Sequence, residues 1–237
     1  MKGGLDTLFT LGRVSNLPTV WMNVLTAGVL VGSGWPGRAL GWPLLALSAL
    51  YCGGMALNDY FDRHVDGREQ PFRPIPAGKI SPDAALAWAI GLLAGGWLLL
   101  LLAPAGSGAW RSGLLLVFVI WAYDRFHKKY AQTVFLMAAA RALVYPTTAW
   151  ALGASWPAVV WIAAAAAFLW TLAITVAARI ENAREDRWGF PVIPWMIAGL
   201  SVVDGALLAI FVSPPWLLAG ILATLLTRLG QQRIRGD

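Results

Sequence analysis

Eight long apolar stretches constrain the fold of this chain more than any other feature. They cover residues 17–34, 40–57, 83–103, 109–123, 131–151, 156–178, 190–211 and 214–230. Each approaches the ~20 residues that an α-helix needs to cross a bilayer, and 109–123 is the shortest. With 58% hydrophobic residues, 13% charged residues and a mean hydropathy of +0.63, the chain is predicted to be all-α. We expect one polytopic membrane domain over residues 1–237, a bundle of about eight transmembrane helices.

The basic residues predict how this bundle lies in the membrane. Of the 18 Lys and Arg residues, only Arg38, Arg111 and Arg141 fall away from one side of the predicted spans. Cytoplasmic segments carry such an excess of Lys and Arg, so both termini and the long polar loops are predicted to be cytoplasmic. This placement accounts for a pI near 9.9 without a nucleic-acid partner. The Ala-, Gly- and Trp-rich composition suggests a bacterial cytoplasmic (inner) membrane, with membrane lipid as a partner.

A row of oxygen-bearing side chains follows the second apolar stretch. In a helix, Asn58, Asp62 and Asp66 lie four residues apart on one face, with Asp59 beside them. Carboxylates this close repel one another unless a cation lies among them. Mg²⁺ prefers oxygen ligands and usually takes one or two carboxylates together with substrate phosphates. The row therefore predicts a site for a metal-bound diphosphate; the alternative is a solvated acidic helix end that pairs with nearby arginines.

Further polar residues fall on the same side of the membrane. Arg13 and Asn16 stand at the start of the first span. Arg73 lies in a Pro- and Gly-rich segment that we expect to form an ordered, non-helical cap, and it could bind a phosphate bidentately. The alternative for Arg73 is an ordinary positive-inside anchor. Asn23 shares a helix face with Asn16, which fits either a polar cavity lining or a hydrogen bond between helices.

Two motifs carry a family resemblance. The pattern N-D-x-x-D-x-x-x-D from Asn58 to Asp66, followed by R-P-I-P-x-G-x-I-S from Arg73 to Ser81, resembles the UbiA superfamily of intramembrane prenyltransferases. Within it, N-D-Y-F-D-R and P-F-R-P-I-P-A-G are most similar to the chlorophyll-synthase-like branch. The opening R-V-S-N-L-P-T is similar to the family's R-x-x-N-x-P-T. The resemblance extends over the first six spans and implies a bundle around a central cavity, for which nine spans are the family norm.

The resemblance implies a role for each polar residue of the site. Asp62, Asp66 and Lys128 would be catalytic. The diphosphate would be bound by Arg13, Asn16, Arg73, Tyr123, Lys128 and Arg141. Tyr123 and Lys128 stand in a segment similar to the family's Y-x-x-x-x-K-R, with Lys129 in place of the usual arginine. His127 in that segment reads as an interfacial residue, not a metal ligand.

Arg141 is the one arginine inside an apolar stretch. A charge at that depth costs roughly 2.5–3.5 kcal/mol on insertion scales, so Arg141 should face the interior and find a partner. Asp204, the acidic residue deep in the later stretches, is the predicted partner. The alternative is a direct role of this pair in acceptor binding or proton removal.

The second acidic motif departs from the family pattern. The family carries D-x-x-x-D at this place, whereas this chain offers Glu181 with Glu185 in one register and Asn182 with Asp186 in the other. The metal ligands implied by both motifs are Asn58, Asp59, Asp62, Asp66, Glu181, Asn182, Glu185 and Asp186. Neither register restores the aspartate pair, which puts the affinity for Mg²⁺ in question.

The resemblance implies Mg²⁺-dependent transfer of a prenyl group from an isoprenoid diphosphate to an aromatic or other lipophilic acceptor within the membrane. Two other classes of function stay open. One is a non-catalytic accessory or transport protein of the same fold, which the altered second motif favours. The other is a membrane terpene cyclase, which would need no acceptor.

Overall fold

The structure is a computed structural model that describes residues 2–32, 37–103, 108–182, 184 and 189–234. Every regular element within these ranges is helical, which confirms the predicted all-α class. Three short 3₁₀ turns (Val14–Asn16, Gly37–Leu40 and Ala131–Thr133) precede α2, α3 and α6. The α-helices are α1 (Lys2–Leu11), α2 (Leu17–Gly32), α3 (Gly41–Glu69), α4 (Pro82–Leu101), α5 (Ala109–Phe126), α6 (Val134–Ala151), α7 (Ala158–Asn182), α8 (Val192–Phe211) and α9 (Trp216–Gln231).

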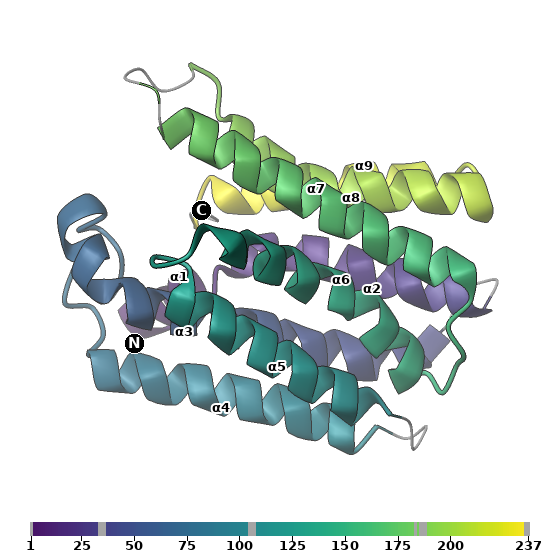
Figure 1. The fold of residues 1–237 in the computed structure, drawn as a ribbon, viewed down its shortest axis with the longest axis horizontal. Coiled ribbons are helices and arrows are strands. Elements are labelled where there is room, and N and C mark those ends of the chain that lie inside the picture. The colour runs from purple at the N-terminus through teal and green to yellow at the C-terminus, as the bar shows by residue number, and fades with distance from the viewer. Residues whose placement is uncertain (1, 33–36, 104–107, 183, 185–188, 235–237) are drawn as a thin grey trace.

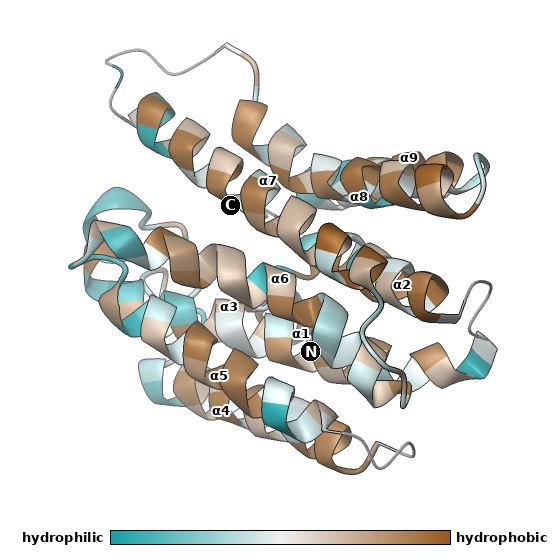
Figure 2. Ribbon diagram, turned by 45° about the vertical axis from the view of Figure 1, so that its right-hand side comes forward, coloured by the Kyte–Doolittle hydropathy of each residue, from teal (hydrophilic) through white to brown (hydrophobic). Residues whose placement is uncertain are grey.

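Helices α2 to α9 fall on the eight predicted apolar stretches. Six of them (α2, α3, α4, α6, α7 and α8) are long and apolar enough to cross a membrane by length and composition. Helix α9 is shorter, with 16 residues, and α5 carries Arg111, Asp124 and Arg125 along its length. Apolar residues cover most of the helix surfaces, and hydrophilic ones gather where α3 ends (Figure 2). The chain is thus an integral membrane protein.

Two features of the helices were not predicted. Helix α1 precedes the first span and exposes Leu5 and Phe9. Helix α3 continues past its apolar stretch to Glu69, and residues 58–66 of this extension contain no proline or glycine. The acidic row is therefore helical, as its spacing required. Helix α4 begins at Pro82, one residue before the predicted stretch 83–103, and the Ser81 hydroxyl caps it by accepting a hydrogen bond from the Ala84 N–H.

Small residues allow neighbouring helices to approach closely. A Cβ added to Gly205 of α8 would lie 2.9 Å from the Gly220 Cα of α9, and one added to Gly220 would overlap the Ser201 carbonyl oxygen. A Cβ on Gly96 of α4 would lie 2.7 Å from the Ala46 carbonyl oxygen of α3. Lipid provides no hydrophobic drive for helix association, so such close backbone contact is a main source of attraction between these helices.

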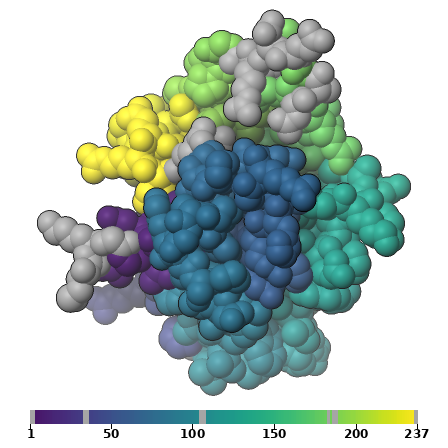
Figure 3. All heavy atoms as spheres, turned by 90° about the vertical axis from the view of Figure 1, so that its left-hand side faces the viewer, coloured from purple at the N-terminus to yellow at the C-terminus, as the bar shows by residue number. Residues whose placement is uncertain are grey.

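The arrangement places the polar ends of several helices together. Helices α7, α8 and α9 lie along one side of the bundle, α3, α4 and α5 along the other, and α2 and α6 between them (Figure 1). The end of α9 meets the start of α2, where the Gln231 side-chain amide donates to Asn16 Oδ1 at 2.8 Å. Figure 3 looks onto this end, whose centre is covered by the end of α3 and the segment after it (blue). Arg13, Arg73 and the acidic row of α3 meet at this end.

Candidate active site

The acidic row of α3 is buried at this end of the bundle. Asn58, Asp59, Asp62 and Asp66 each expose 8% or less of their surface. Burial of an ionised carboxylate is strongly unfavourable unless it is paired and hydrogen-bonded. The alternative of a solvated acidic helix end therefore does not describe this face, and each carboxylate needs a partner.

Arginines from two other segments supply part of that compensation. Arg13, between α1 and α2, places a guanidinium nitrogen 3.2 Å from Asp59 Oδ1. Arg73, in the segment after α3, uses one nitrogen to contact Asp59 Oδ1 at 3.1 Å and Asp66 Oδ2 at 2.9 Å. That segment consists of turns and bends, which agrees with the predicted non-helical cap. Arg73 is thus more than a topological anchor, because it joins two members of the acidic row.

The end of α5 supplies the remaining partners. His127 Nε2 lies 3.2 Å from Asp62 Oδ2, and Lys128 Nζ lies 3.7 Å from the same oxygen. Burial lowers the pKa of His127, but the hydrogen bond to Asp62 and that carboxylate's charge raise it, and the net effect is a raised pKa. The interpretation of His127 as an interfacial residue stays a prediction, and the structure adds that its ring contacts the acidic row. The ring of Tyr123 stacks on His127, with centroids 4.9 Å apart.

Asp124 is a site residue that the sequence did not reveal. It lies in the last turn of α5 and is 4% exposed, and its Oδ1 accepts a hydrogen bond from Asn58 Nδ2 at 3.2 Å. Its other oxygen, Oδ2, is buried and has no hydrogen-bond partner in the structure. The available signal was a carboxylate at the end of an apolar stretch, on the same side of the membrane as the acidic row.

Arg13 reaches the site from a strained backbone. Its φ and ψ are 45° and 48°, the left-handed region that non-glycine residues seldom adopt. This conformation costs roughly 1–2 kcal/mol for a residue with a Cβ. The strain lies at the turn that joins α1 to α2, where it allows the Arg13 side chain to reach Asp59.

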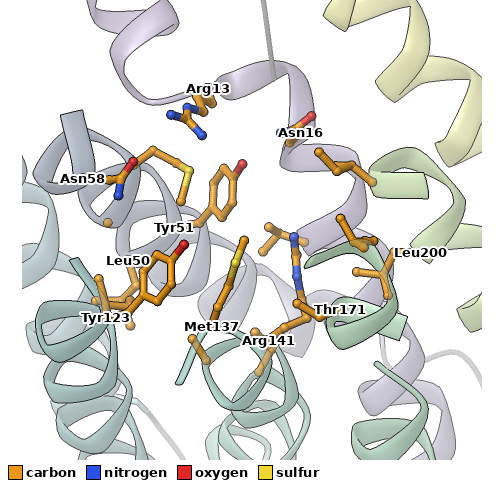
Figure 4. A pocket seen from close by; sticks show the side chains of 18 of the residues that line it. Arg13, Asn16, Leu50, Tyr51, Asn58, Tyr123, Met137, Arg141, Thr171 and Leu200 are labelled. Atoms are coloured by element: carbon orange, nitrogen blue, oxygen red, sulfur yellow. The ribbon is translucent and has the colours of Figure 1, made fainter. Parts of the chain in front are cut away.

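A cavity of about 350 Å³ opens beside the acidic row. Its polar lining includes Arg13, Asn16, Asn58, Tyr123 and Asp124. Deeper in, side chains of α2, α3, α5, α6, α7 and α8 make the lining mostly apolar, among them Leu50, Met137 and Leu200 (Figure 4). The cavity therefore joins a charged mouth to an apolar interior, which suits a ligand with a charged head and a hydrocarbon tail.

Arg141 projects into this cavity, but its predicted pairing with Asp204 is not direct. Arg141 Nη1 donates to Asn23 Oδ1 at 3.2 Å, and Asn23 Nδ2 donates to Asp204 Oδ2 at 2.6 Å. The Tyr145 hydroxyl donates to Asp204 Oδ1 at 2.6 Å. Asn23 thus lies between Arg141 and Asp204 and is hydrogen-bonded to both. Of the two roles considered for Asn23, the structure shows the hydrogen bond between helices, which here joins α2 to α6 and α8.

The second acidic motif lies only partly within the described residues. Glu181, in the last turn of α7, is half-buried. Asn182 ends that helix, and its side chain lies outside the described residues, as do Glu185 and Asp186. The two registers proposed for this motif therefore stay predictions. Nearby, Arg179 donates to the Ala131 carbonyl at 2.8 Å.

The donor chemistry of the first motif fits a hard divalent cation. Three buried carboxylates and one amide lie along α3, and the buried Asp124 of α5 contacts that amide; oxygen donors of this kind are those that Mg²⁺ prefers. In the part of the chain that the structure describes, no three acidic, His or Cys side chains already converge as a metal site. Arginine, histidine and lysine side chains compensate the carboxylates instead. The buried Asp124 oxygen without a partner shows that this compensation is incomplete.

Comparison with known proteins agrees with this geometry. A sequence profile described as the UbiA prenyltransferase family matches residues 16–230, nearly the whole bundle. The chain belongs to the UbiA prenyltransferase family. Of the residues that first suggested the family, Arg13, Asn16 and Asn58 line this cavity, and Arg73 contacts Asp59 and Asp66 of the same acidic row.

Curated UbiA relatives match part of the chain. The digeranylgeranylglyceryl phosphate synthase of Methanothrix thermoacetophila is 44% identical over 96 residues, which cover 39% of this chain and 35% of that protein. The bacteriochlorophyll synthase 33 kDa chain of Cereibacter sphaeroides is 39% identical over 117 residues, which cover 45% of this chain and 35% of that protein. The match thus spans about a third of the length of each relative.

Solved structures show the same fold. A structure of digeranylgeranylglyceryl phosphate synthase superposes with a TM-score of 0.66 at 16% identity, covering 99% of this chain and 96% of that one. A UbiA homologue from Archaeoglobus fulgidus bound to DMAPP and Mg²⁺ gives 0.61 at 18% identity, covering 98% and 89%. At these identities the likeness establishes the fold alone.

Proposed function

We propose that this protein transfers a prenyl group from an isoprenoid diphosphate to a lipophilic acceptor inside the membrane, in a Mg²⁺-dependent reaction. The observation that carries the proposal is the juxtaposition of a buried acidic row, several basic side chains and an apolar cavity. The UbiA homologue bound to DMAPP and Mg²⁺ supports the donor and the cation. The names of the relatives support a prenyl transfer.

The basic side chains at the mouth would act on the diphosphate. When the C1–O bond of the donor breaks, negative charge grows on the departing diphosphate. Arg13, Arg73 and Lys128 lie where they can stabilise that charge, and Tyr123 and Asn16 can orient the phosphate oxygens. These basic groups contact the acidic row in the structure, so donor binding exchanges carboxylate partners for phosphate oxygens.

The cation would be held by the acidic row. Asn58, Asp59, Asp62 and Asp66 supply the oxygens of the first motif, and Glu181, Asn182, Glu185 and Asp186 are the proposed contribution of the second. When bound, Mg²⁺ would supply Lewis-acid stabilisation of the leaving diphosphate. Asp62 and Asp66 are the residues on which we expect activity to depend most.

The apolar part of the cavity would hold the prenyl chain and exclude water. An allylic cation at C1 is quenched by water, so side chains such as Leu50, Met137 and Leu200 protect it. The acceptor attacks C1, a C1–acceptor bond forms, the acceptor loses a proton and diphosphate leaves. Arg141 lies in the same cavity and is proposed to bind the diphosphate or a polar group of the acceptor.

We also propose the location of the reaction. The basic residues of the loops and termini support a cytoplasmic placement of the acidic row and both chain ends, in a bacterial cytoplasmic membrane. The donor would then enter from the cytoplasm, and the acceptor from the surrounding lipid.

Binding of a non-ionisable donor analogue tests the proposal. Geranylgeranyl thiolodiphosphate would be titrated into the detergent-purified protein with and without Mg²⁺, beside Asp62→Asn. Asp83→Asn is the matched control, because Asp83 is an exposed carboxylate at the start of α4. We expect Mg²⁺-dependent binding to the wild type and Asp83→Asn, and loss of binding in Asp62→Asn.

Turnover assays then separate the remaining functions. Prenylated product that appears only with an added lipophilic acceptor supports transfer. A product formed from the natural donor alone indicates a cyclase. Binding without Mg²⁺ dependence, or no binding at all, refutes the transferase proposal and favours a non-catalytic membrane protein.

A further inference from the structure

Asp124 has a buried carboxylate oxygen that makes no hydrogen bond in the described part of the chain. Only 4% of the surface of Asp124 is exposed, and the residue lines the cavity together with Asn58 and Tyr123. One carboxylate oxygen is hydrogen-bonded to Asn58, whereas the other has no hydrogen-bond partner among the residues that the structure describes. An unsatisfied buried oxygen costs roughly 1–3 kcal/mol, and more when it is charged. Such a group is retained at a site when a ligand completes it.

The nearby cationic side chains are committed elsewhere. His127 directs Nδ1 at the backbone carbonyls of Tyr123 and Asp124, both at 3.2 Å, and Nε2 at Asp62. Lys128 lies 3.7 Å from Asp62. Arg73 joins Asp59 to Asp66. None of these contacts involves Oδ2 of Asp124, so within the described residues this oxygen is left for a ligand.

The same carboxylate fixes the orientation of Asn58. Asn58 Nδ2 donates to Asp124 Oδ1 at 3.2 Å, so the Asn58 side chain presents its NH₂ group to Asp124. The carbonyl oxygen of the Asn58 amide is then turned away from Asp124 and is available as a ligand. Asp124 therefore contributes in two ways: one oxygen orients the amide, and the other stands beside it.

We propose that Asp124 is a ligand of the divalent cation, donated by α5 and additional to the acidic row of α3. This inference rests on the proposed function, from which it takes the cation. Asp124 would add a carboxylate from a third segment of the chain. The second acidic motif of this chain lacks the family's aspartate pair. One added carboxylate suits Mg²⁺ or Mn²⁺, which accept few protein carboxylates and complete their shell with water and phosphate oxygens.

Direct cation binding tests the role of Asp124 without any turnover. Mn²⁺ would be titrated into the purified protein in the presence of geranylgeranyl thiolodiphosphate, with free Mn²⁺ followed by electron paramagnetic resonance. Asp124→Asn keeps the shape and the acceptor oxygen for Asn58 but removes the charge. We expect Mn²⁺ affinity to fall by about tenfold or more, the size of effect seen when the surroundings of metal ligands are altered. Asp124→Glu, which restores the charge, should recover part of the affinity.

Asp204→Asn is the matched control, because Asp204 is also a buried aspartate. Both of its oxygens are hydrogen-bonded, to Tyr145 and Asn23, far along the chain from the acidic row. This variant should melt at a lower temperature and bind Mn²⁺ as the wild type does. Asp124→Asn should show the reverse pattern, with a cation-free melting temperature close to that of the wild type, since Oδ2 of Asp124 makes no hydrogen bond in the described part of the chain and Asn keeps the acceptor for Asn58.

The outcomes are separable. If Asp124→Asn binds Mn²⁺ as tightly as the wild type, or if it only lowers the melting temperature as Asp204→Asn does, Asp124 is a structural residue and the inference is overturned. A wild type that binds Mn²⁺ through Asp124 but forms no product overturns the transferase function and leaves this site in place. A wild type that does not bind Mn²⁺ overturns both.

Discussion

Replacing Arg73 with glutamine should expose the competition between arginine and metal in this site. The guanidinium contacts Asp59 at 3.1 Å and Asp66 at 2.9 Å, and the three side chains are only 11%, 5% and 3% exposed. Removing one partner of a buried ion pair costs about 3–5 kcal/mol. Asp59 keeps Arg13, so the loss falls mainly on Asp66 and belongs at the lower end, about 3 kcal/mol.

Added Mg²⁺ should then raise the unfolding stability of Arg73→Gln more than that of the wild type. A cation that binds only the folded protein stabilises it by about 2.7 kcal/mol at 100 times its dissociation constant. This is nearly the loss caused by Arg73→Gln, and in the variant the cation no longer has to displace a guanidinium. Thermal unfolding in detergent over a Mg²⁺ titration measures the effect.

Arg63→Gln provides the matched control for that titration. Arg63 donates to the Tyr60 carbonyl at 2.7 Å and stacks over the Tyr60 ring, so its loss should not alter the response to Mg²⁺. The reasoning is refuted if Arg73→Gln unfolds at the wild-type temperature, or if added Mg²⁺ raises the two melting temperatures equally.

Three further predictions concern the interior and the cation. Tyr145→Phe removes hydrogen bonds to Asp204 and Asn23 and should lower unfolding stability by about 1–2 kcal/mol, measured by thermal unfolding; an unchanged melting temperature would contradict the network. Ala140→Leu adds bulk to the cavity wall and should reduce kcat/KM for a geranylgeranyl donor by about tenfold relative to a geranyl donor; an equal loss for both donors would show that Ala140 does not bound the prenyl chain. Chelation of the cation with EDTA should abolish binding of the thiolodiphosphate, and an excess of Mg²⁺ should restore it. Binding that persists in EDTA would mean that the basic residues bind the diphosphate without a cation.

The fold could be predicted well from the sequence because a membrane-spanning helix has few requirements. A span needs only length and apolar character, and all eight predicted stretches coincide with helices α2 to α9. The acidic row was predicted because its members stand four residues apart within one helix. The extension of α3 to Glu69 and the short helix α1 were missed, since both lie in polar sequence where hydropathy carries no signal.

Contacts between helices were predicted less well. Nothing in the local sequence indicates that Asp124 of α5 meets Asn58 of α3, or that His127 meets Asp62. These pairings depend on the rotation and depth of two helices, which apolar periodicity does not define. For the same reason, a direct pair of Arg141 with Asp204 was predicted. Both residues belong to one network, but Asn23 lies between them and bonds to each.

The left-handed backbone at Arg13 constrains how this chain can be altered. Glycine at position 13 would adopt that φ without strain, but it would remove the guanidinium that contacts Asp59 at 3.2 Å. Such a change would trade the guanidinium at the cavity mouth for a more relaxed turn. Position 13 should therefore stay fixed when the chain is engineered for crystallisation or expression, because Arg13 is a proposed ligand of the diphosphate.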